Sequence, residues 1–164
     1  MIPIRSRVAA VGAGVALLVA GGAIASTQAV AAPHAIPTCN VSGLSLAIGQ
    51  PQGAAGSFLY PINFTNKSAG ECALRGYPGV SVLDANHHQI GTPATENGQP
   101  VTTVYVAPGK TVTATIRTND PGVDPNCRAT SAYIGVYPPA GYQQALIPYQ
   151  LRVCGIFQIS PVQS

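Results

Sequence analysis

Regular alternation of apolar and polar residues is the feature that most constrains the fold of this chain. In residues 111–117, Val112, Ala114 and Ile116 alternate with three threonines and an arginine. Successive side chains of a strand point to opposite faces, so this pattern predicts a strand with one buried and one solvated face. The same period recurs elsewhere, whereas no segment of residues 32–164 longer than a turn carries helical periodicity. Antiparallel sheets accommodate strands of this kind.

The alternating segments and the turns between them predict an all-β fold. Pro-Gly in residues 107–110 is typical of a type II turn. About eight short strands separated by such signals favour an immunoglobulin-like antiparallel β-sandwich, with a jelly roll or a small barrel as alternatives. Pro61 and Pro148 fall inside strand-like runs, which predicts an edge strand or a bulge at each. The expected strands span residues 44–48, 58–65, 80–84, 101–106, 111–117, 130–137, 145–153 and 156–162.

Residues 1–31 have the organisation of an export signal. Two arginines in residues 1–7 precede an uncharged apolar run at residues 8–20, and an A-x-A cleavage signal ends at Ala31, immediately before Ala32. The apolar run is short and rich in glycine and alanine, which favours a removable signal over a retained anchor. We therefore expect a protein that is secreted, extracellular or associated with the cell wall, with no transmembrane span in the mature chain.

The remaining sequence suits one domain. We expect a flexible mature start at residues 32–38, then a single β-sandwich domain at residues 39–164, and a monomer. Two of the eight basic residues lie in the predicted signal, so the formal charge of +3 falls by two on cleavage. A nearly neutral surface offers no electrostatic footprint for nucleic acid or anionic lipid, so we expect no nucleic-acid partner.

All four cysteines follow the predicted signal, which indicates disulfides in an oxidising compartment. Cys39 precedes the first expected strand and Cys72 follows the second, while Cys127 and Cys154 flank two later strands in the same way. If each pair of strands is antiparallel, these ends meet, and the pairs are Cys39–Cys72 and Cys127–Cys154. A cysteine-ligated metal is the weaker reading, because no C-x-x-C spacing occurs. Cys39 is the first cysteine after the apolar run, and Pro37 before it fits a lipid-attachment site poorly.

Catalytic patterns are absent from the sequence. There is no G-x-S-x-G elbow and no phosphate-binding glycine loop. With its cysteines paired, the chain has no thiol nucleophile. The five carboxylates fall in or beside predicted turns rather than as a pair across a cleft. We therefore expect no enzymatic activity and no cofactor. The carboxylates are Glu71, Asp84, Glu96, Asp120 and Asp124.

The adjacent pair His87-His88 is the strongest candidate for metal binding. In a turn both imidazoles can approach one ion, and Asp84 supplies a carboxylate three residues earlier. Exposed histidines in turns are more often simply solvated, so these three are weak candidates. Asp120 and Asp124 lie in a proline- and glycine-rich loop that lacks the dense oxygen pattern of a calcium site, and turn formation is the favoured role.

Tyrosines mark a candidate binding loop. Tyr137 and Tyr142 enclose Pro-Pro-Ala-Gly between two expected strands, and Tyr149 lies close by. A proline-stiffened loop presents flat, amphipathic rings at low entropic cost, as binding loops often do. The competing role is structural, in which such rings cover the core or anchor a corner through the hydroxyl. Tyr77, in Gly-Tyr-Pro-Gly, carries the same two interpretations.

Several stretches together resemble a secreted actinobacterial envelope family catalogued only as a domain of unknown function. The likeness extends from Cys39 to about Val162. It implies an exported, immunoglobulin-like domain whose four cysteines are those of the family, and it implies no activity or catalytic residue. The stretches are Asn-Phe-Thr-Asn-Lys-Ser at 63–68, Leu-Arg-Gly-Tyr-Pro-Gly-Val at 74–80, Ser-Val-Leu-Asp-Ala at 81–85, Ile-Gly-Thr-Pro-Ala at 90–94, Ala-Pro-Gly at 107–109 and Val-Tyr-Pro-Pro at 136–139.

These observations favour a non-enzymatic protein that acts by surface contact. The expected partner is a protein, glycan or lipid of the cell envelope, met through the loop of Tyr137, Tyr142 and Tyr149. The alternative is a metal- or small-ligand-binding protein that uses the turn of His87 and His88.

Overall fold

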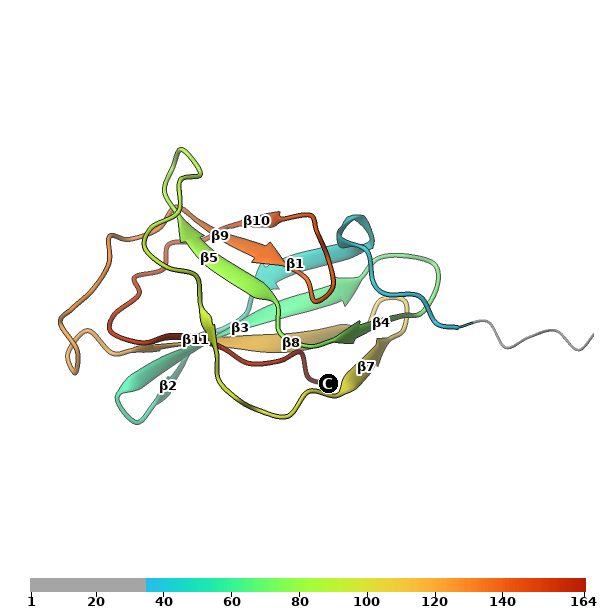
Figure 1. Cartoon of the computed structure of the whole chain (residues 1–164), viewed down its shortest axis with the longest axis horizontal. Helices are drawn as coiled ribbons and strands as arrows, with labels where there is room; N and C mark the ends of the chain where they lie inside the picture. Colours follow the sequence, from blue (N-terminus) through green and yellow to red (C-terminus); the bar gives the residue numbers. More distant parts are fainter. Residues whose placement is uncertain (1–34) are drawn as a thin grey trace, which may run out of the picture. The chain divides into compact units, whose positions relative to one another are not determined.

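The computed structural model describes residues 35–164 (Figure 1). The predicted signal and its cleavage position at Ala31 and Ala32 lie outside the described residues. Within the described range the chain is all-β, with eleven strands and one short 3-10 turn, η1 (Val41–Gly43). No helix in this range has the length and apolar character needed to cross a bilayer.

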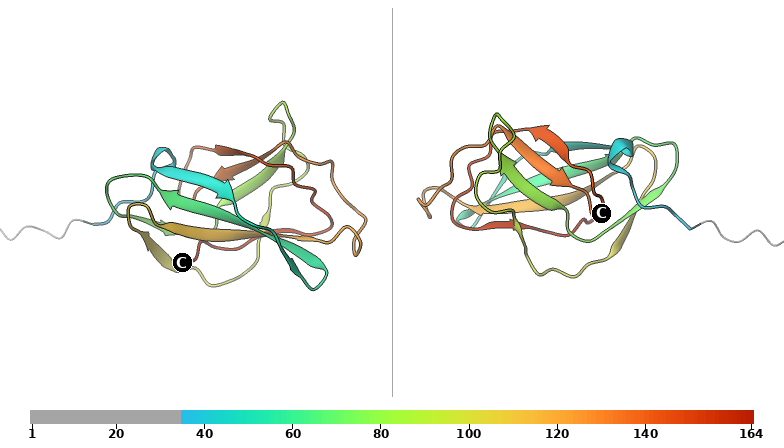
Figure 2. Two further views of the ribbon diagram at one scale, coloured as in Figure 1. Left: turned by 180° about the vertical axis from the view of Figure 1, so that it is seen from behind. Right: turned by 45° about the horizontal axis from the view of Figure 1, so that its top comes forward.

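The largest sheet is built around a long central pair of strands (Figure 2). β3 and β8 pair antiparallel from Ser57 opposite Asn119 to Thr65 opposite Thr111. β1 and β2 pair with the other edge of β3, while β11 pairs with β8 and β6 runs parallel to β11. The strands are β1 (Leu44–Ile48), β2 (Gln52–Ala54), β3 (Ser57–Asn66), β6 (Thr95–Glu96), β8 (Thr111–Asn119) and β11 (Phe157–Ile159).

Two smaller sheets complete the fold. The three-stranded sheet has the order β10-β9-β5, with β10 (Ala145–Pro148), β9 (Tyr133–Tyr137) and β5 (Gly79–Leu83). The two-stranded sheet pairs β4 (Cys72–Arg75) with β7 (Thr103–Val106). Thr38 forms a parallel bridge with Ala73 of β4, so the segment around Thr38 lies beside this small sheet.

The core forms where the alternating apolar faces meet. Even-numbered residues of β3 and β8 face inward, and residues of β5 and β9 from the three-stranded sheet join them in one buried cluster. On β8, the odd-numbered Thr111, Thr113 and Thr115 face outward, as the alternation predicts. The largest fully buried members from these strands are Phe64, Ile62, Ile116, Ile134, Val80, Val82 and Val136.

The all-β prediction is confirmed, and each expected segment contains a strand. The immunoglobulin-like arrangement stays a prediction. Three short strands, β2, β4 and β6, were not expected. The expected strand at 130–137 begins only at Tyr133. Before it, Ser131 N donates to Leu151 O at 2.9 Å, and the buried Ser131 hydroxyl adds two further bonds at 3.0 Å, donating to Tyr149 O and accepting from Leu151 N.

The two prolines inside strands differ in their settings. Pro148 lies in β10, an edge strand as expected. Pro61 lies in β3, which has neighbours on both sides, at the point where its partner changes from β1 to β2. Its carbonyl accepts from Gly49 N there at 2.8 Å. The missing N–H of Pro61 therefore coincides with an interruption of the neighbouring strand.

The described residues contain two disulfides, Cys39–Cys72 and Cys127–Cys154, which are the pairs that the strand order favoured. Cys127 and Cys154 also form an antiparallel bridge. Within residues 35–164 no cysteine is free.

Candidate functional site

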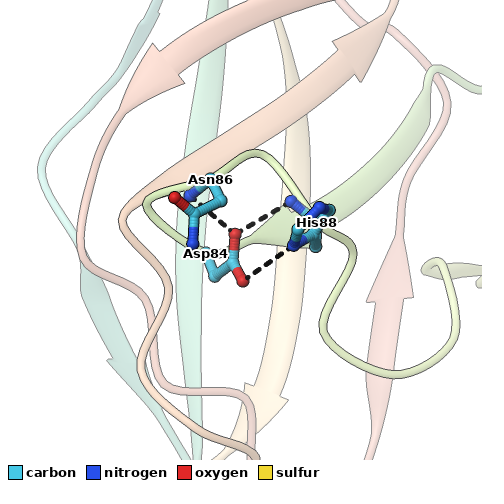
Figure 3. Close-up of polar contacts among 3 residues, drawn as sticks. All are labelled: Asp84, Asn86 and His88. Carbon is cyan, nitrogen blue, oxygen red and sulfur yellow. Dashed lines mark hydrogen bonds and ion pairs between the residues drawn. The ribbon is translucent and has the colours of Figure 1, made fainter.

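The turn after β5 holds Asp84 and His88 together (Figure 3). Asp84 Oδ1 accepts hydrogen bonds from the backbone N–H of Asn86 at 2.8 Å and of His88 at 2.9 Å. His88 Nδ1 lies 3.5 Å from Asp84 Oδ2. The backbone hydrogen bond from His88, supported by that from Asn86, holds the pKa of Asp84 below its ordinary value. The carboxylate therefore closes the turn.

His87 is directed to a different neighbour. Its ring packs edge-on against Tyr133, with the ring centroids 4.7 Å apart, and its backbone has a left-handed φ of 65°. The structure therefore brings together two of the three predicted ligands, Asp84 and His88. Within residues 35–164, no group of three or more His, Cys, Asp or Glu side chains is arranged to hold a metal ion. Protein metal sites commonly draw three or four ligands from the chain.

Asp120 and Asp124 stabilise turns of the loop after β8. Asp120 Oδ1 accepts from Gly122 N at 2.7 Å, and Asp124 Oδ1 accepts from Asn126 N at 3.0 Å. The bond from Asn126 holds the pKa of Asp124 below its ordinary value. This is the turn-forming role that the sequence favoured over calcium binding.

The three tyrosines of the predicted binding loop have separate environments. Tyr142 is 97% exposed and Tyr137 is 41% exposed. Tyr149 is half-buried and packs edge-on against Tyr60, with centroids 6.1 Å apart. Tyr77 is anchored through its hydroxyl, which donates to the Gln99 carbonyl at 2.6 Å. Of these rings, Tyr142 alone projects almost fully into solvent.

A tight turn presents Tyr142. Ala140 adopts a left-handed φ of 59°, and Gly141 N donates to Pro138 O at 2.8 Å. Tyr142 and its neighbour Gln143 line a shallow hollow of about 350 Å³, which residues 38–41 also line. We call this the first hollow.

The segment at residues 37–40, here the arm, is fixed to the small sheet. Cys39 N donates to Ala73 O at 3.0 Å, and Ala73 N donates to Pro37 O at 2.9 Å. The Cys39–Cys72 disulfide adds a covalent link at the same place. This wall of the first hollow is therefore held by both hydrogen bonds and a disulfide.

A second hollow of about 360 Å³ adjoins the arm. It shares Thr38 and Asn40 with the first hollow and also has Ser42, Ser68 and Glu71 in its lining. The first hollow has no charged residue in its lining, and the second has one, Glu71. Hydroxyl and amide groups dominate the polar part of both.

A third hollow, of about 420 Å³, lies on the outer face of the largest sheet. Gln52, Asn63 and Thr115 contribute to its lining, with Leu59 and Pro61. No projecting aromatic ring belongs to its lining. It differs from the first hollow in this respect.

Sequence reasoning found Tyr142 but missed Thr38, Asn40 and Gln143. The expected Cys39–Cys72 pair is the one signal that located the arm against the body of the domain. The arm lies near residues 140–143 because segments about a hundred positions apart pack together, and no local sequence pattern predicts such packing.

Comparisons with known proteins give a family and no activity. The family model described as Domain of unknown function (DUF4232) matches residues 39–163. No curated protein matches the sequence. A crystal structure of a β-glucosidase from Kluyveromyces marxianus aligns over 71% of this chain and 14% of its own, at 11% identity and a TM-score of 0.35. The X-ray structure of Northeast Structural Genomics Consortium target SoR45 aligns over 68% of this chain and 83% of its own, at 12% identity and a TM-score of 0.23. Similarity this low supports no conclusion about fold or activity.

Proposed function

We propose that this chain, which belongs to the family Domain of unknown function (DUF4232), is a secreted, non-enzymatic protein that binds a partner of the cell envelope around Tyr142. The observation that carries the proposal is the 97% exposure of the Tyr142 side chain at the rim of the first hollow. A tyrosine ring left in water forgoes the stabilisation of burial, and exposed aromatics are enriched at binding surfaces.

The disulfides support an extracellular location. Both pairs join segments about thirty residues apart, which in the loop-entropy description contributes on the order of 3–4 kcal/mol each. Such bonds persist in oxidising compartments and are rare in reducing ones. This agrees with the expected export signal.

The placement of the carboxylates supports a role in binding rather than catalysis. Asp84, Asp120 and Asp124 accept backbone hydrogen bonds within their own turns. Glu71 is the one carboxylate among the residues that line the two hollows. Acid–base hydrolysis of a glycosidic bond typically uses two facing carboxylates, which this surface does not offer.

Retention on isolated cell envelopes tests the proposal. The mature domain should sediment with envelopes, and Tyr142→Ala should lose most of that retention. Val123→Ala is the control, because Val123 is also an exposed apolar side chain, at 66%, but lies outside both hollows. Equal retention of the wild type and Tyr142→Ala, or no retention of the wild type, would refute the proposal.

A further inference from the structure

We infer that the partner at this site is an uncharged glycan chain that lies across the arm and occupies both hollows. The inference rests on the proposed function and specifies its ligand.

The chemistry of the first hollow matches a sugar ring. Tyr142 offers a flat aromatic face, against which the C–H face of a pyranose or furanose can pack. Thr38 supplies a hydroxyl and Gln143 an amide to the lining of the same hollow. Hydroxyl and amide groups both donate and accept, as sugar hydroxyls do, so they match without a net charge.

The charge of the lining selects against acidic ligands. No lysine, arginine or histidine lines either hollow, and Glu71 in the second hollow repels anions. Phosphate groups and uronic acids are normally bound by arginine or lysine. The complementary ligand is therefore a neutral one.

The exposed apolar surface is small for a lipid or a protein. Insertion into a bilayer interface uses several apolar side chains, commonly together with basic ones. Protein interfaces bury a centre of several apolar side chains. Tyr142 is the one large apolar residue in the lining of the two hollows that is more than a third exposed.

The arrangement of the two hollows favours a glycan chain over a single sugar as the ligand. Thr38 and Asn40 line both hollows, so the two form adjoining subsites separated only by the arm. Both are open and shallow, unlike the enclosed cavities that bury small ligands. The Cys39–Cys72 disulfide fixes the arm between them, which reduces the ordering required on binding.

Binding to defined polysaccharides tests the inference. The mature domain is titrated by calorimetry with soluble neutral polysaccharides (a glucan, a mannan, a galactan and an arabinan), and with polygalacturonate and phosphatidylglycerol vesicles. We expect binding to at least one neutral polysaccharide and to neither acidic probe. Tyr142→Ala should weaken that binding about three- to tenfold. Thr38→Val and Gln143→Ala should each weaken it about threefold.

Thr115→Val is the matched control for Thr38→Val, because it removes a hydroxyl from the third hollow. The affinity of Thr115→Val for the neutral polysaccharide should equal that of the wild type. Binding lost in Thr115→Val but kept in Tyr142→Ala would overturn the inference, as would binding to polygalacturonate or vesicles alone.

The two proposals fail in different ways. If envelopes retain the domain in a Tyr142-dependent manner, but their glycan fraction after protease digestion and lipid extraction does not, the glycan inference is wrong and the proposed function stands. If Tyr142→Ala binds intact envelopes as the wild type does, both are wrong.

Discussion

The side-chain amide of Asn66 donates a hydrogen bond of 2.7 Å to the backbone carbonyl of Val106, forty positions later in the chain. The same Nδ2 donates to Gly70 O at 2.8 Å, and Oδ1 accepts from the backbone and hydroxyl of Ser68. Asn66 is fully buried. It therefore joins the loop that borders the second hollow to β7, and every polar atom of its side chain is paired.

Asn66→Ala should lower the free energy of unfolding by about 2–4 kcal/mol, because it leaves several buried partners without a hydrogen bond. Asn63→Ala, on the half-exposed outer face of the same strand, should lower it by less than about 1 kcal/mol. Urea unfolding measures both. A similar small loss in the two variants would contradict this role of Asn66.

The two disulfides should differ in their effect on binding. They close loops of similar length, so the paired variants Cys39→Ser with Cys72→Ser and Cys127→Ser with Cys154→Ser should each lose about 3–4 kcal/mol of stability. Glycan affinity, measured at a temperature where both are folded, should fall only in the first variant, because only Cys39–Cys72 fixes the arm. An equal fall in both would show that the arm has no special part in binding.

Arg128 anchors the loop that follows the histidine turn. Its Nη1 donates to Thr92 O at 2.6 Å and to Ile90 O at 3.2 Å, and its guanidinium carbon lies 5.2 Å from the ring centroid of Phe157. Lysine keeps the charge but not the planar fork. Arg128→Lys should lower stability by about 1–3 kcal/mol and speed amide hydrogen exchange at residues 90–92. The exposed Arg152→Lys is the control, and equal exchange in both variants would contradict the assignment.

Stability should depend on Asp84 at acid pH. Its pKa is lower in the folded protein, mainly through the His88 N–H, so the ionised carboxylate favours folding above its ordinary pKa of about 4. That contribution is lost as the pH falls through the folded-state pKa. Between about pH 5 and pH 2.5 the wild type should lose more stability than Asp84→Asn, because only the wild type loses an ionised carboxylate at this turn. Identical pH profiles in urea unfolding would show that the turn does not depend on this charge.

The strands could be predicted from the sequence wherever the alternation of apolar and polar side chains determines which face is buried. Alternation placed β8 and its inward Val112, Ala114 and Ile116, because burial of one strand face is a local property of the sequence. It placed the start of β9 too early, because the segment around Ser131 is bonded partly through the serine hydroxyl rather than as a regular strand. It also gave no sign of β6, whose two residues are held by the parallel neighbour β11.

The candidate site was only partly predictable. Tyr142 stood out because prolines and a glycine precede it in a turn, and turn-forming residues can be recognised in a sequence. Asp84, His87 and His88 also lie in a turn, as the sequence predicted. His87, however, has a left-handed backbone and its ring packs against Tyr133 rather than lying beside Asp84 and His88. The expected Cys39–Cys72 pair indicated where the arm at residues 37–40 lies, but the pairing of the arm with Ala73 is a tertiary contact that no local pattern encodes.

Backbone amide chemical shifts provide the most direct measurement of the binding surface. A titration of the labelled mature domain with the neutral polysaccharide that binds best should move the amides of residues 38–43 and 140–143, and leave those of residues 84–88 unchanged. Perturbations confined to the outer face of β3 and β8, or to the histidine turn, would contradict a binding surface around Tyr142.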